Sequence, residues 1–200
     1  QKKNKFDAQK PISTDLTSRH IIYDILVAVD KGVHFDKALA VNQLLPKLDD
    51  RDRRFVRLLA TTSLRHRGQL EKVLAPLVAR RPFGAQANAN LILLMGAAQL
   101  LLLKTGAHAA VDNTVELMRQ TGFERLCGLA NAVMRRLTRE GEELCAATTA
   151  VDNLPDWLHQ SWRHYWGDAV TMAIADLAML PPPLDISVKG DAKAWAETLE

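Results

Sequence analysis

Cationic side chains are concentrated in one segment of this 200-residue chain, residues 51–81. The segment holds nine Lys and Arg residues, eight of them arginines, against only Asp52 and Glu71. A guanidinium makes paired hydrogen bonds to phosphate oxygens, and a local excess of such groups attracts a polyanion. We therefore expect this segment to bind nucleic acid. The candidate contact residues are Arg51, Arg53, Arg54, Arg57, Arg65, His66, Arg67, Arg80 and Arg81.

A second interpretation of these arginines stays open, because cations on the outer face of an amphipathic helix are often simply solvated. Two features favour anion binding instead. Arginine is used in place of lysine almost throughout, which suits two-point contacts with phosphate. Carboxylates that could neutralise the guanidiniums are also scarce nearby. His66 is included among the candidates because it lies between Arg65 and Arg67.

Catalytic chemistry is harder to find in these residues. The six histidines form no H-E-x-x-H motif, and the ten glycines form no G-x-G-x-x-G loop that could cradle a nucleotide. Cys127 and Cys145 have no partner at metal-ligand spacing and no neighbouring charge that would activate a thiol. We therefore expect no catalytic residue, no cofactor site and no metal site here, and we interpret both cysteines as structural.

Composition and charge place the chain among ordinary globular proteins. It is 48% hydrophobic and 24% charged, and the two cysteines suggest a reducing, cytoplasmic environment. The longest uncharged run, residues 82–103, is interrupted by polar side chains, and the N-terminus does not resemble a signal peptide, so we expect no membrane association. The net charge of +3 divides into +8 for residues 1–150 and −5 for residues 151–200.

Helical periodicity dominates the first 150 residues. Apolar residues spaced i, i+3, i+4 and i+7 predict helices that begin near residues 15, 36, 50, 70, 90, 109 and 126. Asp49 or Asp50 is a suitable N-cap for the third helix. Its expected apolar stripe is Phe55, Leu58, Leu59 and Thr62, with Arg53 and Arg57 on the opposite side.

The later helices suggest how the bundle is arranged. Residues 90–103 are apolar on almost every side, which indicates a central helix packed all round by others. The seventh helix is expected to end before Gly141. These segments, with no convincing strand among them, predict an all-α helical bundle over residues 1–145.

The pattern changes after about residue 150. Five of the eleven aromatic residues fall in this last quarter, Pro155 suits the start of a helix, and three consecutive prolines at 181–183 must end it. Residues 184–189 then alternate apolar and polar, as a strand does. We interpret residues 146–200 as linker helices and the start of a second, small α/β module. Because the chain starts without Met and stops in an expected helix, we expect it to be a piece of a longer protein.

Several segments together resemble one known family. They are similar to the central and last helices of the NusB-type RNA-binding fold at the N-terminus of the bacterial ribosomal RNA small-subunit methyltransferase B family, also called Sun or Fmu proteins. The similar segments are Gly96–Leu103, His108–Leu117 and Leu129–Arg136, supported by Arg19–Leu26, Asp50–Phe55, Leu64–Glu71, Pro155–Leu158 and Pro182–Ile186.

The resemblance implies a parent enzyme that transfers a methyl group from S-adenosylmethionine to carbon 5 of a cytosine in small-subunit ribosomal RNA. It also implies that the paired catalytic cysteines and the cofactor site belong to a C-terminal catalytic domain in cis, outside these 200 residues. Neither Cys127 nor Cys145 stands in the Pro-Cys or Thr-Cys context of those cysteines. This region is then expected to bind and orient ribosomal RNA without methylating it.

Two other functions compete with this one. The chain could be an adaptor resembling the free transcription antitermination factor NusB, which binds RNA together with a ribosomal protein. The extra 50 residues at the C-terminal end, with their proline-rich turn and expected strand, argue against that, since a free factor would end near residue 140. A purely structural helical module would instead require the arginine cluster to be ion-paired within the fold.

Overall fold

The computed structural model describes residues 14–78, 82, 84–182, 187–191, 195 and 197–198; the side chains of residues 14–16 and 85 are not described. The α-helices are α1 (Thr14–Asp30), α2 (Phe35–Val41), α3 (Asp50–Arg65), α4 (Arg67–Leu74), α5 (Ala89–Ala97), α6 (Ala107–Gln120), α7 (Cys127–Ala146) and α8 (Asp156–Met179). Shorter helical turns are η1 (Leu45–Lys47), η2 (Gly84–Gln86), the π-helical η3 (Ala98–Leu102), η4 (Glu124–Leu126) and η5 (Ala150–Asn153).

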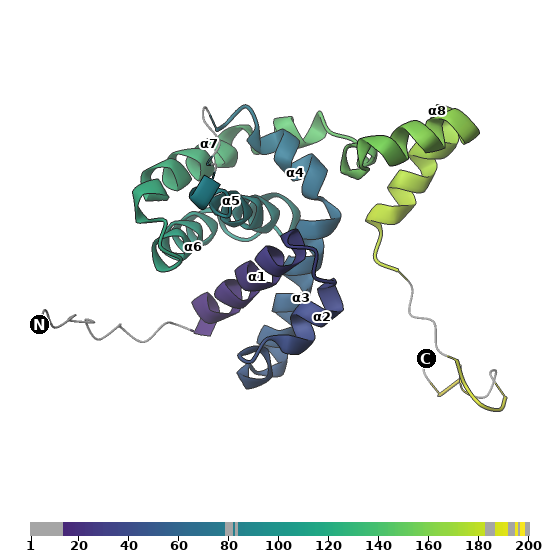
Figure 1. Cartoon of the computed structure of the whole chain (residues 1–200), viewed down its shortest axis with the longest axis horizontal. Coiled ribbons are helices and arrows are strands. Elements are labelled where there is room, and N and C mark those ends of the chain that lie inside the picture. The colour runs from purple at the N-terminus through teal and green to yellow at the C-terminus, as the bar shows by residue number, and fades with distance from the viewer. Residues whose placement is uncertain are drawn as a thin grey trace, which may run out of the picture.

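Helix α5 is the centre of the bundle, with α1, α4, α6 and α7 packed around it (Figure 1). Every side chain from Leu91 to Ala98 is buried. The absence of charge in this segment makes such complete burial possible, because each buried charge would need a partner. The predicted central helix is therefore confirmed, except that it ends in the π-helical η3.

The buried face of α3 differs from the expected stripe. Val56, Leu59, Ala60 and Ser63 are buried, whereas Leu58 is 52% exposed. Both sets fit the helical spacing, so the pattern alone could not choose between them. The set that faces α1 has the smaller side chains, which allow the two helices to pack closely. Leu59 and, in part, Phe55 pack against the core as expected, whereas Leu58 is exposed and Thr62 is only half-buried, so the centre of the buried stripe is shifted by one residue.

Helix α7 continues through Gly141 and ends only at Ala146, so the expected end before Gly141 was wrong. Gly141 is buried, and a Cβ atom there would lie 2.8 Å from the Cδ2 atom of Leu101 in η3. The absence of a side chain at Gly141 lets α7 and η3 approach closely, and a helix tolerates the glycine at a cost of about 1 kcal/mol.

Residues 148–153 lie on α4 and join the bundle to α8. The backbone N–H of Gln69 donates to the Asn153 side chain at 2.9 Å, and Asn153 donates back to the Gln69 side chain at 2.8 Å. Lys72 pairs with Asp152 at 2.9 Å, and Gln69 also donates to Thr148 at 3.1 Å. We call this set of contacts the α4–η5 joint.

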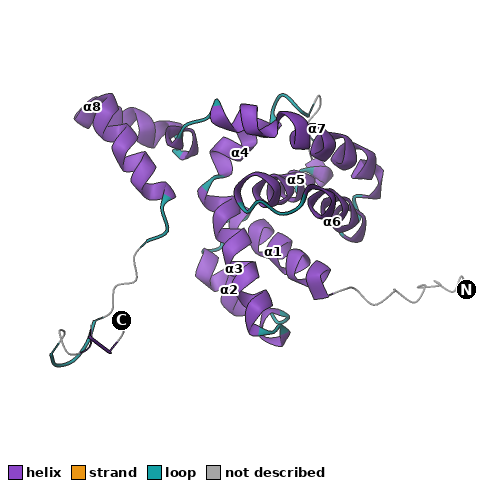
Figure 2. Ribbon diagram, turned by 180° about the vertical axis from the view of Figure 1, so that it is seen from behind, coloured by secondary structure: helices purple, strands orange, loops and turns teal. Residues whose placement is uncertain are grey.

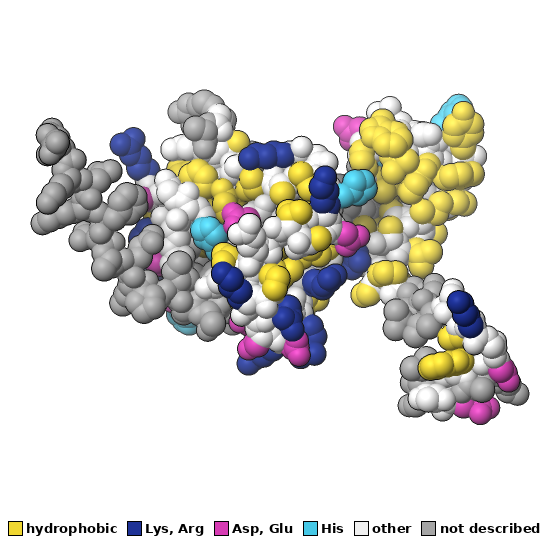
Figure 3. Space-filling view, turned by 60° about the horizontal axis from the view of Figure 1, so that its bottom comes forward, with side chains coloured by type: hydrophobic (Ala, Val, Ile, Leu, Met, Phe, Trp, Pro, Cys, Tyr) yellow, Lys and Arg dark blue, Asp and Glu magenta, His cyan; other side chains and the backbone are white. Residues whose placement is uncertain are grey.

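Helix α8 stands away from the bundle as two arms (Figure 2). They meet at Gly167, whose backbone leaves the helical region with a φ of 76°. Several large apolar side chains of the arms are exposed, and Figure 3 shows this apolar surface. The described residues contain no strand (Figure 2), so the strand expected at 184–189 is not confirmed. Residues 184–186 of that segment lie outside the described residues.

Candidate nucleic-acid interface

The first two turns of α3 present four arginines, Arg51, Arg53, Arg54 and Arg57, which we call the α3 arginines. The helix begins at Asp50 because the side chain of Asp49 accepts the backbone N–H of Asp52 at 2.7 Å. All four arginines are exposed. Figure 3 shows Lys and Arg side chains gathered over the α2 and α3 end of the molecule, with a few carboxylates among them.

The α3 arginines differ in whether the fold neutralises them. Arg53 pairs with Asp50 and also donates to the backbone carbonyl of Pro46 at 3.4 Å. Arg51, Arg54 and Arg57 form no ion pair with any described residue. Three uncompensated guanidiniums on two turns of one helix create a positive surface that can bind phosphate groups.

Arg65, His66 and Arg67 lie at the junction between α3 and α4, and all three are half-buried. Arg65 has no ion pair with a described residue, and the His66 ring lies 3.0 Å from the Gln69 side chain. Arg67 pairs with Asp30 and with Glu71, the latter at 2.9 Å. The hydrogen bonds that Arg67 donates to the Asp30 carboxylate raise the pKa of Arg67 above its usual value. The fold thus uses Arg67 to connect α4 to the end of α1.

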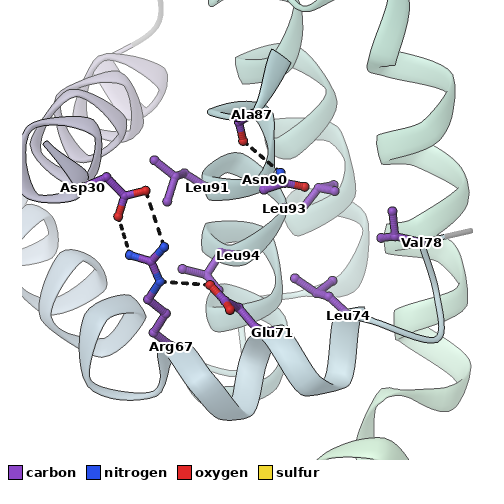
Figure 4. Close-up of a pocket in the computed structure, with 10 residues that line it drawn as sticks. All are labelled: Asp30, Arg67, Glu71, Leu74, Val78, Ala87, Asn90, Leu91, Leu93 and Leu94. Atoms are coloured by element: carbon purple, nitrogen blue, oxygen red, sulfur yellow. Dashed lines mark hydrogen bonds and ion pairs between the residues drawn. The ribbon is translucent and has the colours of Figure 1, made fainter. Parts of the chain in front are cut away.

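Arg67 also lies at one end of a pocket of about 240 Å³ between α1, α4 and α5, as Figure 4 shows. Leucines form much of the remaining lining, including Leu91 and Leu94. Asp30 and Glu71 leave the polar end with a net negative charge, so it is a poor site for phosphate. Its volume is below the roughly 300–1,000 Å³ of most small-molecule sites. Arg80 and Arg81 lie outside the described residues.

A different depression lies beside the α3 arginines, and we call it the α2–α3 groove. It has a volume of about 400 Å³ and is lined by Asp36, Leu39, Ala40, Leu45, Pro46, Arg53 and Arg57. Its residues come from α2, η1 and α3. Of these residues, only the two arginines were expected from the sequence to form a binding surface. Pro46, directly after the Leu44–Leu45 pair, was the signal that a turn would bring apolar groups beside them.

The remaining acidic, histidine and thiol side chains form no comparable cluster within the described residues. No three His, Cys, Asp or Glu side chains of the described part are grouped so that they could hold a metal ion. Cys127 and Cys145 are both free thiols and half-buried, and the Cys127 thiol lies 3.6 Å from the Val115 carbonyl oxygen. Within the described ranges, no helix has the length and apolarity needed to cross a membrane.

A helical bundle with an arginine-rich edge is thus the class that fold and site define, and comparison places it in a family. Residues 16–139 match the model of the NusB family, and the chain belongs to that family.

The chain is also similar to longer proteins named "Ribosomal RNA small subunit methyltransferase B". It is 32% identical over 180 residues to the one from Xylella fastidiosa (strain 9a5c), covering 88% of this chain and 41% of that protein. It is 33% identical over 171 residues to the one from Thermus thermophilus, covering 86% and 40% respectively. The chain therefore spans about 40% of the length of these relatives. The resemblance inferred from the sequence is confirmed.

The similarity to these relatives extends beyond the NusB match. An alignment that covers 88% of a 200-residue chain must include most of α8, whichever end it starts from. Helix α8 and the α4–η5 joint therefore belong to the region shared with the relatives.

Proposed function

We propose that this chain is the RNA-binding region of an S-adenosylmethionine-dependent methyltransferase that modifies carbon 5 of a cytosine in small-subunit ribosomal RNA. On this proposal, the region binds and positions the RNA in the cytoplasm, and a catalytic domain in cis carries the cofactor and the reacting cysteines. On the same proposal, the helical domain comprises residues 1–145, and residues 146–200 hold linker helices and the start of a second, small module.

One observation carries the proposal: Arg51, Arg54 and Arg57 are exposed on adjacent turns and have no ion pair with another described residue. Phosphate contact is the function that best accounts for this arrangement, because it neutralises charge that the fold leaves uncompensated. Arg65 extends the surface toward α4. We infer that the nucleic acid is ribosomal RNA because the names of the similar proteins include it.

On this proposal, methyl transfer takes place outside this region. The pocket beside Arg67 has a volume of about 240 Å³, below the roughly 300–1,000 Å³ of most small-molecule sites, so it is too small to enclose S-adenosylmethionine. The cofactor's contribution, a transferable methyl group, is therefore assigned to the catalytic domain of the parent protein.

The adaptor function remains the competing proposal, because the NusB match itself covers residues 16–139. Similarity to the methyltransferases that continues into α8 favours the first proposal. A purely structural role would require the arginines to be paired within the fold, as Arg53 and Arg67 are.

The test is the salt dependence of binding to a small-subunit ribosomal RNA fragment. Each phosphate contact on single-stranded RNA contributes about 0.7 to the slope of log affinity against log salt concentration. The Arg54→Ala/Arg57→Ala variant should therefore flatten the slope by about 1.4. Arg125→Ala/Arg135→Ala is the matched control, since both of these arginines are exposed and lack an ion pair with a described residue. Equal slopes for wild type and both variants would leave the α3 arginines as solvated side chains.

A further inference from the structure

The α2–α3 groove combines an apolar floor with a cationic wall. Leu39, Ala40, Leu45 and Pro46 supply the apolar groups, and Arg53 and Arg57 line the α3 side. Such a combination differs from a site for phosphate alone, which needs charge but no apolar surface. A nucleotide has both parts, a flat base and a charged phosphate.

The walls of the groove are held by the fold itself. The side chain of Asn42 ends α2 by accepting the backbone N–H groups of Leu44 and Leu45, each at 3.0 Å. Arg53 then connects α3 to η1 through its hydrogen bond to the carbonyl of Pro46. The groove therefore exists before any ligand binds, which reduces the entropy lost on binding.

The two arginines have different roles in this geometry. Arg53 is oriented by Asp50 and Pro46, whereas the Arg57 guanidinium has no ion pair with a described residue and is available to a phosphate. Asp36 lies among the lining residues contributed by α2, and its negative charge would repel a phosphate placed there. A nucleotide in the groove must therefore direct its phosphate toward α3.

We propose that the α2–α3 groove binds the base of a single unstacked nucleotide while Arg57 contacts its phosphate. This deepens the proposed function and rests on it. In a duplex the bases are stacked inside and cannot reach such a floor, whereas loops and single strands can turn a base outward. The groove's volume of about 400 Å³ lies within the usual range for small-molecule sites. The region thus selects single-stranded or looped segments of ribosomal RNA over paired ones.

The test variant adds apolar volume to the α2–α3 groove without changing its charge. Ala40 is exposed on α2 and lines the groove, so Ala40→Leu should occupy the space intended for the base and leave folding intact. The control is Ala109→Leu, an equal change at an exposed position of α6. Binding is measured for two RNAs with the same number of phosphates, one unstructured and one a hairpin stem.

The groove offers aliphatic groups and no aromatic ring, so we assign its contact with a base about 1.4 kcal/mol, which corresponds to a tenfold change in affinity. We expect Ala40→Leu to weaken binding of the unstructured RNA by about tenfold and to leave stem binding unchanged, while Ala109→Leu changes neither. An equal effect of Ala40→Leu on both RNAs, or no effect on either, overturns the groove proposal. Failure of the proposed function itself is recognised separately: Arg57→Ala would then leave both RNAs bound as in the wild type, or the wild type would bind neither.

Discussion

A Cβ atom added to Gly68 would lie 1.8 Å from the backbone carbonyl oxygen of Asp152, so α4 and η5 touch through their main chains at this point. The obstacle is backbone, and no side-chain rotation can relieve it. Gly68→Ala should therefore separate η5 from α4 and lower the free energy of unfolding by about 1–3 kcal/mol. Amide hydrogen exchange should become faster for residues 148–154 and stay slow in α5.

Gly128→Ala is the matched control for this change, because Gly128 is also helical and a Cβ atom there meets nothing within 4 Å. That variant should be neutral or slightly more stable, since alanine favours a helix. Unchanged exchange at residues 148–154 in Gly68→Ala would mean that the α4–η5 joint tolerates the added methyl group.

Acid should weaken the α4–η5 joint through Asp152. Burial by itself would raise the pKa of Asp152, but the backbone N–H of Thr149 and the Lys72 ammonium outweigh it and hold the pKa below its usual value. A carboxylate whose pKa is depressed by folding stabilises the protein above its unfolded pKa of about 3.9. That stabilisation is lost as the pH falls through the folded pKa.

Asp152→Asn should consequently lower the melting temperature at pH 7 and have less effect as the pH falls below about 4. Thermal unfolding of the wild type and the variant across this range measures the difference. Asp112→Asn serves as the control, because Asp112 is exposed on α6 and has no ion pair with a described residue. A penalty in Asp152→Asn that stays constant down to pH 2.5 would contradict the assigned role of the charge.

Arg67 and Arg65 should give opposite results in mutagenesis although they are two positions apart. Arg67 is held by Asp30 and Glu71, so Arg67→Ala should lower stability by about 1 kcal/mol, a modest value because all three side chains are partly exposed to solvent. Arg65 lacks an ion pair with a described residue, so Arg65→Ala should leave stability unchanged and flatten the salt dependence of RNA binding. Denaturant unfolding and RNA titrations on both variants test this; the reverse assignment of the two effects would refute it.

The apolar pattern predicted a helix correctly where it allowed one buried face, and it did not identify the buried face where it allowed two. Residues 90–103 carry no charge, so a central buried helix was the natural interpretation. In α3, stripes starting at Phe55 and at Val56 fit equally, and packing against α1 decided between them. Gly141 was interpreted as a helix end because the sequence cannot show that Leu101 packs against it.

In the candidate site, too, features set by neighbouring residues were predictable, whereas contacts between residues far apart in the sequence were not. Exposure of Arg53 and Arg57 followed from helical spacing and is confirmed. The pairing of Arg67 with Asp30 joins residues 37 positions apart, and no local pattern predicts it. The α2–α3 groove likewise needs residues from three elements, and the turn that brings them together depends on Asn42 and its two backbone contacts.

Arg19 provides the last prediction, because it is a charged residue inside the bundle. Arg19 is only 4% exposed, and its Nε atom donates a hydrogen bond to the Oε1 atom of Gln99 at 2.8 Å. The guanidinium also lies over the ring of Phe55, 5.1 Å from its centre. Gln99 is itself positioned by a hydrogen bond from its amide to the carbonyl of Met95.

Gln99→Leu should lower the free energy of unfolding by about 2–3 kcal/mol, because a hydrogen bond to a buried charge is lost and water cannot replace it. Phe55→Leu should cost less, about 1 kcal/mol, since a half-buried ring contributes a weaker cation–π contact. Gln43→Leu, at an exposed position between α2 and η1, controls for the substitution itself and should be nearly neutral. Urea unfolding of the three variants measures these differences. If Gln99→Leu were as stable as Gln43→Leu, the Arg19 charge would have to be satisfied without Gln99, and the contact between α1 and η3 would owe its stability to apolar packing alone.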